Sequence, residues 1–101
     1  MKPDKITRIM SELGNSTRLD IFRLLVRDGG EGLVVGEIGR RLNIPPSTLG
    51  FHLKGLVDVG LVSQKKSGRS ILCQPQLDVL LNALRDIERE CCADTIQREN
   101  L

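Results

Sequence analysis

Cys91 and Cys92 are adjacent cysteines in the stretch ERECCADT, close to the end of the sequence, and the chain has one other cysteine, Cys73. Soft thiolates prefer soft metal ions and metalloids to hard ions. Two tethered sulfurs therefore suit trivalent arsenic, and they would also support thiol redox chemistry. Packing alone is a third interpretation of Cys91, because it continues the helical spacing of Leu84 and Ile87. Cys92 lies about 100° further round such a helix, outside that apolar stripe.

Enzymatic use of these thiols is not indicated by the rest of the sequence. The chain contains no Cys-X-X-Cys motif and no β-α-β pattern, and its only histidine, His52, is remote from the cysteine pair in sequence. The acidic residues around the pair do not favour thiolate formation. We therefore expect a protein that is not an enzyme.

The composition predicts a single domain over residues 1–101, built mainly from packed helices. Hydrophobic residues make up 40% of the chain, but its only aromatic residues are Phe22 and Phe51, so leucine, isoleucine and valine must form the core. No apolar run approaches the roughly 20 residues that cross a membrane. The N-terminal residues lack the pattern of a signal peptide, and unpaired cysteines are typical of a reducing compartment. We therefore expect a cytoplasmic protein with no membrane partner.

Positive charge is concentrated in one part of the chain. The net charge is +2, but residues 40–69 carry six basic side chains and one acidic side chain. Residues 1–39 are balanced in charge, and residues 70–101 are net acidic. A single basic segment is typical of a surface that binds a polyanion such as nucleic acid. The alternative is a basic surface that contacts only solvent.

Periodic apolar residues predict five helices and a hairpin. We expect helices near residues 6–13, 16–26, 34–44 and 47–58, then strands near 61–66 and 69–74, and a last helix that begins at Pro75. The turn of the hairpin is expected at Ser67-Gly68, and Ser47 is expected to cap the fourth helix. The fold class is therefore mainly α with a small β-hairpin, in the order α-α-α-α-β-β-α.

Two short helices, a proline-containing turn and a basic hairpin occur in the order of a winged helix-turn-helix. The second of these helices must bury one face and present the other to the major groove of DNA, with small or polar residues near its N-terminal end. The hairpin, or wing, would contact the DNA backbone or minor groove. The residues that fit these requirements are Ser47, Thr48, Gly50 and Lys54 in the helix, and Lys65, Lys66 and Arg69 in the wing.

Two stretches resemble the ArsR/SmtB family of bacterial metal- and metalloid-responsive repressors. IPPSTLGFHLKGLVDVGLVSQKKSGRSILC is similar to the recognition helix and wing of that family, and GNSTRLDIFRLL is similar to its second helix. The resemblance extends over residues of roughly 6–92, and it implies a homodimer, joined through the first and last helices, on double-stranded operator DNA. The implied DNA-binding residues are Ser47, Thr48, Gly50, Phe51, His52 and Lys54 in the recognition helix, and Lys65, Lys66 and Arg69 in the wing.

Three of these positions have alternative interpretations. Gly50 replaces a serine that is frequent in the family, which removes a hydroxyl group from the DNA-facing helix. Phe51 would either contact a thymine methyl group or pack under the wing. His52 borders the apolar face of its helix, so packing competes with base contact as its role.

Comparison with the inducer sites of the family leaves the cysteine pair as the candidate inducer site. Val34-Val35-Gly36-Glu37 stands where arsenic-sensing members have Cys-Val-Cys-Asp, and the last helix lacks the histidine of the zinc-type sites. Other members resemble this chain in carrying a Cys-Cys pair at the end of the last helix. The resemblance therefore implies that As(III), methylarsenite or Sb(III) binds Cys91 and Cys92, with Cys73 or a cysteine of the other subunit as a candidate third ligand. No cofactor is expected for DNA binding itself.

We therefore predict a homodimeric repressor that leaves its operator when a trivalent arsenical binds the cysteine pair. The alternative is the same DNA-binding fold acting as a thiol redox or sulfur-species sensor. A third hypothesis is a protein-interaction module that uses the last helix, in which case any binding to DNA would depend little on salt.

Overall fold

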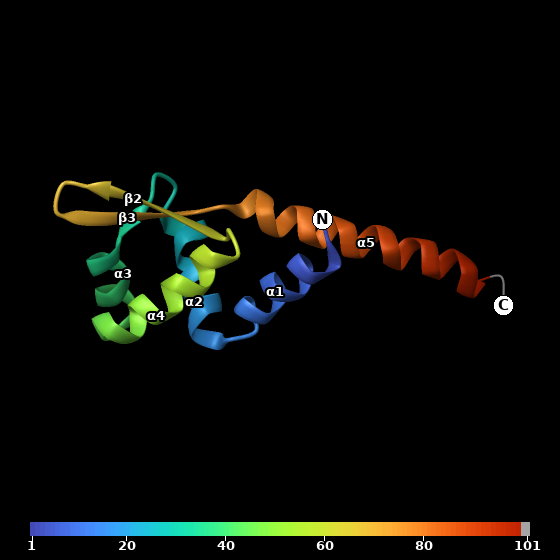
Figure 1. Cartoon of the computed structure of the whole chain (residues 1–101), viewed down its shortest axis with the longest axis horizontal. Coiled ribbons are helices and arrows are strands. Elements are labelled where there is room, and N and C mark those ends of the chain that lie inside the picture. The colour runs from blue at the N-terminus through green and yellow to red at the C-terminus, as the bar shows by residue number, and fades with distance from the viewer. Residues whose placement is uncertain (100–101) are drawn as a thin grey trace.

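The structure is a computed structural model that describes the backbone of residues 1–99 and the side chains of residues 1–90. The helices are α1 (Pro3–Leu13), α2 (Ser16–Asp28), α3 (Val35–Leu42), α4 (Pro46–Asp58) and α5 (Leu77–Glu99). The strands are β1 (Leu33–Val34), β2 (Val62–Ser67) and β3 (Ser70–Pro75). The predicted order of helices and hairpin is confirmed, with β1 added between α2 and α3 (Figure 1).

The core lies among α2, α3, α4 and the sheet. Ile21 and Leu25 of α2, Ile38 of α3, and Leu49 and Leu56 of α4 have at most 1% of their surface exposed. Within residues 1–90, no polar or charged residue is fully buried. The predicted core of branched aliphatic residues is therefore confirmed.

A sharp turn separates α3 from α4. Asn43 ends α3 in the left-handed conformation with a φ of 54°. Pro46 is the first residue of α4, a position where its missing N–H costs no helical hydrogen bond. The prediction that Ser47 caps α4 is wrong, because Pro45 occupies the cap position and Ser47 lies in the first turn.

The sheet is antiparallel, with the strand order β1-β3-β2. In the β2–β3 hairpin Ser67 pairs with Ser70, so the turn is Gly68-Arg69 and not the predicted Ser67-Gly68. Gly68 has a φ of +63°, as the first turn position of this kind of two-residue hairpin requires. β1 pairs with β3 through Leu33, and its two residues are too few to show the alternation by which a strand is recognised in a sequence.

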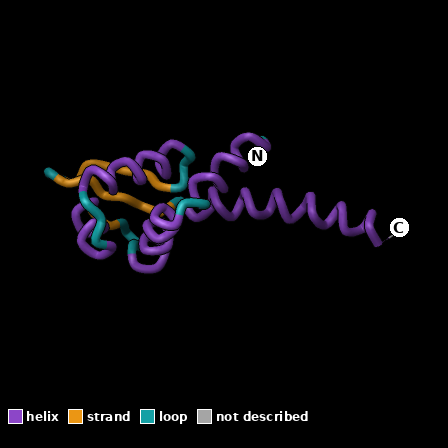
Figure 2. The backbone as a smooth tube through the Cα atoms, turned by 90° about the horizontal axis from the view of Figure 1, so that it is seen from below, coloured by secondary structure: helices purple, strands orange, loops and turns teal. Residues whose placement is uncertain are grey.

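α5 extends well beyond the rest of the molecule, as both views of the chain show (Figures 1 and 2). It packs against α1, and the Met1 amino group lies 2.8 Å from Asp86 Oδ2. α5 begins at Leu77 rather than at the predicted Pro75, because Pro75 is still paired with Val62 in the sheet. In the described part of the chain, no helix has the length and apolar character needed to cross a membrane. In the part of α5 whose side chains are described, residues 77–90, the large apolar side chains that remain exposed are Leu77, Leu81, Leu84 and Ile87.

Gly32 lies just before β1, at a place where no side chain fits. Its φ is +109°, and a Cβ atom there would lie 2.8 Å from Leu72 Cγ and 2.9 Å from the Cys73 carbonyl oxygen. Both neighbours belong to β3, so the glycine allows the loop after α2 to pass close to the central strand of the sheet.

We expect Gly32→Ala to lower the free energy of unfolding by about 2 kcal/mol, since it adds backbone strain to a collision in the sheet. Gly30→Ala is the matched control, because a Cβ atom at Gly30 meets nothing within 4 Å. The control should change stability by less than about 0.5 kcal/mol. Urea denaturation followed by circular dichroism measures both variants, and equal stabilities would contradict this account of Gly32.

Candidate nucleic-acid interface

The outward face of α4 carries the residues that the sequence predicts for DNA contact. Leu49, Leu53 and Leu56 are buried, and this turns one side of the helix to the core. The roughly 100° step between helical residues then determines which residues face solvent. Apart from Phe51, the side chains in the first turns of this face are small or flexible, so the helix backbone can approach a DNA groove closely. The predicted DNA-contact residues of α4 that are exposed are Ser47, Thr48, Gly50, Phe51 and Lys54.

Phe51 is the one large apolar side chain on this face, with 65% of its surface exposed. The structure does not place it under the wing. A pocket of about 290 Å³ lies between α4 and the wing, and the α4 residues that line it are Gly50, Leu53, Lys54 and Val57. Phe51 is therefore not part of the space under the wing, and most of its surface is open to solvent.

The Phe51 ring is in contact with two other side chains. The Arg18 guanidinium lies 5.5 Å from the ring centroid, and the His52 ring meets it edge-on with 5.5 Å between centroids. His52 is partly buried, and its Nδ1 is buried with no hydrogen-bond partner in the described part of the chain. This environment favours packing over base contact as the role of His52.

Lys54 lies one turn beyond Gly50 and is 77% exposed at its side chain. Its Nζ donates to Asp58 Oδ2 at 3.1 Å. An exposed ion pair of this kind contributes at most about 1 kcal/mol. A DNA phosphate can therefore replace Asp58 as the partner of this lysine.

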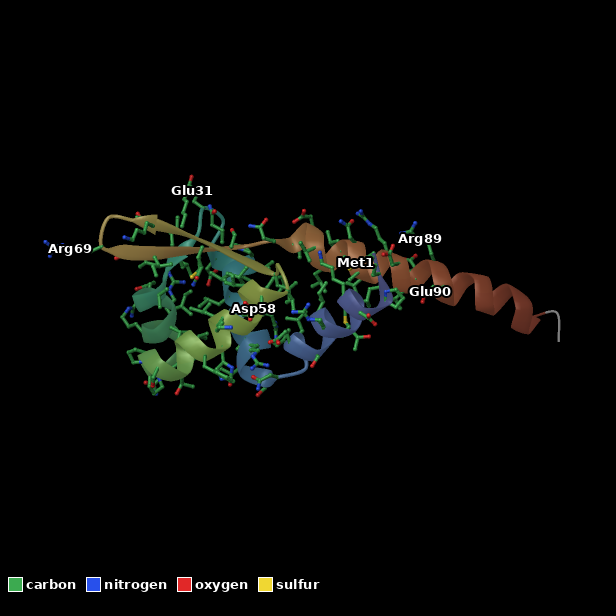
Figure 3. All side chains as sticks on the ribbon, viewed as in Figure 1. Met1, Glu31, Asp58, Arg69, Arg89 and Glu90 are labelled. Carbon is green, nitrogen blue, oxygen red and sulfur yellow. The ribbon has the colours of Figure 1, made fainter. Side chains whose placement is uncertain are left out.

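The β2–β3 hairpin carries the other predicted basic residues, and all three are exposed. Lys65 and Lys66 are successive residues of β2, so they lie on opposite faces of the hairpin. Arg69 occupies the turn, and Figure 3 shows its side chain projecting away from the molecule. The turn lies at the same end of the molecule as the first turn of α4 (Figure 1). The wing therefore carries its positive charge at the end of the molecule where α4 begins.

Arg40 and Arg41 belong to the same basic segment of the sequence, but both form ion pairs with Glu37. Arg40 Nε donates to Glu37 Oε2 at 3.0 Å, Arg41 Nε donates to Oε1 at 2.8 Å, and Arg41 also reaches Asp28. The hydrogen bond from Arg40, and then that from Arg41, lowers the pKa of Glu37 to about 2. Glu37 is therefore ionised at neutral pH, and the basic side chains at this end of the molecule that form no ion pair within the described residues are those of the wing.

Cys73 is fully buried in β3, opposite Leu33 on one side and Gln64 on the other. Burial raises the pKa of its thiol, although the Gln64 side chain donates a hydrogen bond to its Sγ at 3.5 Å. A protonated, buried thiol is a poor ligand for a metal or metalloid. The structure therefore gives no support to Cys73 as a third thiolate.

Cys91 and Cys92 lie in α5, but their side chains are outside the described residues. The helix rises by about 21 Å between Leu77 and Cys91, so the pair is well separated from Cys73 of the same chain. Among the side chains that the structure describes, no three of His, Cys, Asp or Glu are grouped in a way that could hold a metal ion.

Glu12 and Arg18 lie against α4 and are not among the residues predicted from the sequence. Arg18 Nη1 is 3.1 Å from Glu12 Oε2, and both side chains are largely buried. Arg18 falls within the stretch GNSTRLDIFRLL, but the helical periodicity of that stretch does not reveal which residues touch α4. Such a contact between distant segments becomes visible only in the folded chain.

The chain matches the family model of a helix-turn-helix domain over residues 13–64, just over half of its length. It is 35% identical over 83 residues to a putative arsenical resistance operon repressor of Halobacterium salinarum, which covers 80% of this chain and 64% of that protein. The chain spans less than two thirds of the length of the curated relatives that it matches.

Solved structures share the whole arrangement of helices and wing. An ArsR-like transcriptional regulator from Rhodococcus sp. RHA1 superposes with a TM-score of 0.80 at 25% identity, covering 94% of this chain and 86% of that one. A homodimeric winged helix-turn-helix DNA-binding domain from Mycobacterium bovis, a possible ArsR-family regulator, superposes with a TM-score of 0.69 at 26% identity, covering 86% and 80%. With α4 followed by a wing, the chain therefore belongs to the helix-turn-helix family, and it has the winged helix-turn-helix fold of the ArsR-like regulators that it resembles.

Proposed function

We propose that the protein is a repressor that binds operator DNA as a homodimer through α4 and the wing. The observation that carries the proposal is the outward face of α4, which exposes small residues and Phe51 beside a basic wing. The major groove is wide enough to admit one helix, and it carries the donor and acceptor pattern that distinguishes all four base pairs. The wing supplies charge for the sequence-independent part of the affinity.

The residues of this surface divide into two roles. Base edges are approached by the first turns of α4, where Ser47 and Thr48 offer hydroxyl groups, Gly50 allows close approach and Phe51 contacts a thymine methyl group. His52 packs behind Phe51 rather than contacting a base. Phosphates are contacted by Lys54, Lys65, Lys66 and Arg69, which position the protein on the duplex without selecting its sequence.

A second copy of the chain is the proposed partner at the other end of the molecule. α5 leaves a row of large apolar side chains exposed, which a symmetric contact with a second α5 would cover. The related Mycobacterium bovis domain is homodimeric. Two recognition helices related by a two-fold axis would enter successive major grooves about 34 Å apart.

The proposed inducer is a trivalent arsenical, either As(III) or methylarsenite, or else Sb(III), bound by Cys91 and Cys92. Support comes from the soft donor character of the two thiolates and from the similarity to the Halobacterium salinarum protein named as an arsenical resistance operon repressor. The pair lies in α5, the helix proposed to join the two protomers. An occupant that binds one dimer arrangement better than the other would shift the equilibrium between DNA-bound and free protein.

The salt dependence of DNA binding tests the phosphate contacts of the wing. Removal of one phosphate contact should reduce the slope of log affinity against log salt by about 0.9, hence by roughly 1.8 in a homodimer. We expect this change for Lys66→Gln and for Arg69→Gln, measured by fluorescence anisotropy on a labelled duplex. Arg23→Gln is the matched control, because Arg23 is an exposed residue of α2, outside α4 and the wing, and the salt slope of this variant should equal that of the unmodified protein. A salt-independent affinity of the unmodified protein would contradict DNA binding and favour a protein-interaction module.

Serine substitution tests the cysteine pair. The Cys91→Ser, Cys92→Ser double variant should bind operator DNA as tightly as the unmodified protein, yet stay bound when arsenite or methylarsenite is added. Cys73→Ala is the control, and it should still be released, because its thiol is buried in the sheet. Release is measured by anisotropy during titration with each arsenical, and continued release of the double variant would contradict the proposed site.

The same titration distinguishes the redox alternative. If the pair is a thiol switch, mild oxidant should release the unmodified protein from DNA and produce a disulfide between subunits, detected by mass spectrometry, with no response to arsenicals. A response to arsenicals in reducing buffer that disappears in the double variant favours the metalloid sensor.

A further inference from the structure

Phe51 is in an unusual position for a phenylalanine. Within residues 1–90 it has the largest exposed fraction, 65%, among the large hydrophobic side chains that remain accessible. It also lies on the face of α4 proposed to enter the major groove. A phenylalanine in a helix has two favourable χ1 rotamers, so a ring on the surface needs a neighbour to hold it in one of them.

Arg18 provides that neighbour. Its guanidinium lies over the Phe51 ring at 5.5 Å from the centroid, a distance at which a cation is attracted to the face of an aromatic ring. The Arg18 side chain is only 16% exposed, unlike most surface arginines. Its backbone is fixed as well, because its N–H donates to the capping side chain of Asn15 at 3.1 Å.

Glu12 holds the other side of the guanidinium. Its Oε2 lies 3.1 Å from Arg18 Nη1, and its side chain is 24% exposed. The contact is an ion pair without hydrogen-bond alignment, since Glu12 Oε2 and Arg18 Nε are both buried and have no hydrogen-bond partner among the described residues. The pair is therefore held by charge and by the surrounding packing.

Gly55 makes room for this ion pair on the recognition helix. A Cβ atom at this position would collide with the Glu12 carboxylate and would lie 3.3 Å from Arg18 Nε. Gly55 is one helical turn after Phe51, so the ion pair lies directly against the backbone of α4. Three segments therefore converge under the exposed ring: the end of α1, the start of α2 and the middle of α4.

We propose that Arg18 is a positioning residue that holds the Phe51 ring ready for contact with a thymine methyl group, and that Glu12 holds Arg18 in place. The inference rests on the proposed DNA-binding function. One face of the ring contacts the guanidinium, and the remaining surface meets the C5-methyl group, the feature of thymine that apolar side chains recognise in the major groove. A ring already ordered before binding loses less conformational freedom when the complex forms. Arg18 thereby affects base preference without touching the base.

Deoxyuridine provides the direct probe, because it differs from thymidine only by lacking that methyl group. A preferred duplex is first selected by the unmodified protein from a random pool, and each thymine is then replaced in turn by deoxyuridine. One thymine in each half-site should show a penalty of about four-fold in affinity, the effect of burying one methyl-sized group. The penalty is the ratio of affinities for the two duplexes, so a general loss of charge or stability cancels from it.

The variants form a double-mutant cycle. Phe51→Ala should abolish the penalty, and Arg18→Met should reduce it to less than about two-fold, because the ring is then held in no single rotamer. The double variant should match Phe51→Ala alone if Arg18 acts through Phe51. Arg23→Met, which removes a charge from an exposed position on α2, is the matched control and should keep the full penalty. If Arg18→Met fails to fold, Glu12→Gln replaces it in the test. This variant keeps the shape of the site but removes the charge that holds Arg18, so it should also reduce the deoxyuridine penalty.

The outcomes test the positioning role of Arg18, the thymine contact of Phe51 and DNA binding separately. An unchanged penalty in folded Arg18→Met, or in Glu12→Gln where Arg18→Met does not fold, would overturn the positioning role. A penalty absent from the unmodified protein would overturn the thymine contact of Phe51. Failure to select any preferred duplex would instead overturn the proposed DNA-binding function, so the two failures are distinguishable.

Discussion

Burial of Leu49, Leu53 and Leu56 is the constraint on which the rest of the molecule depends. Full burial of a leucine side chain contributes roughly 1.5–3 kcal/mol, and three such residues on one helix fix its rotation about its own axis. The outward face of α4 is then determined by helical geometry alone. The same leucines bring α3 close, because Gly39 lies directly against Leu49 and a Cβ atom there would be 3.3 Å from its Cδ2. The DNA-facing surface is thus a consequence of how the core packs.

Elements with a clear period of apolar residues could be predicted from the sequence, whereas elements defined by distant contacts could not. α2 and α4 repeat leucine and other apolar residues over several turns, and the presence of both helices follows from that spacing alone. β1 has only two residues and exists because Leu33 pairs with β3 about forty residues later in the chain. The start of α5 differs from the prediction for the same reason, since pairing with Val62 keeps Pro75 in the sheet.

In the candidate site, too, features with a local sequence pattern could be predicted and features that depend on distant contacts could not. The exposed residues of α4 follow from its helical period, and the basic wing follows from its charge and its turn. Charge counting overstates the basic surface, however, because Glu37 forms ion pairs with Arg40 and Arg41 and Asp58 forms one with Lys54. The contact between Arg18 and Phe51 joins two helices far apart in sequence, and no local pattern indicates it.

Gly55 has a consequence for how this sequence can diverge. Because the Glu12 carboxylate occupies the space that a side chain at position 55 would need, neither residue is independent of the other. A relative that carries alanine or a larger residue at the position of Gly55 has no room for this ion pair, and it must then support its recognition helix from α1 and α2 by other means. Positions 12, 18 and 55 are therefore expected to covary across homologues, even though they belong to three different helices.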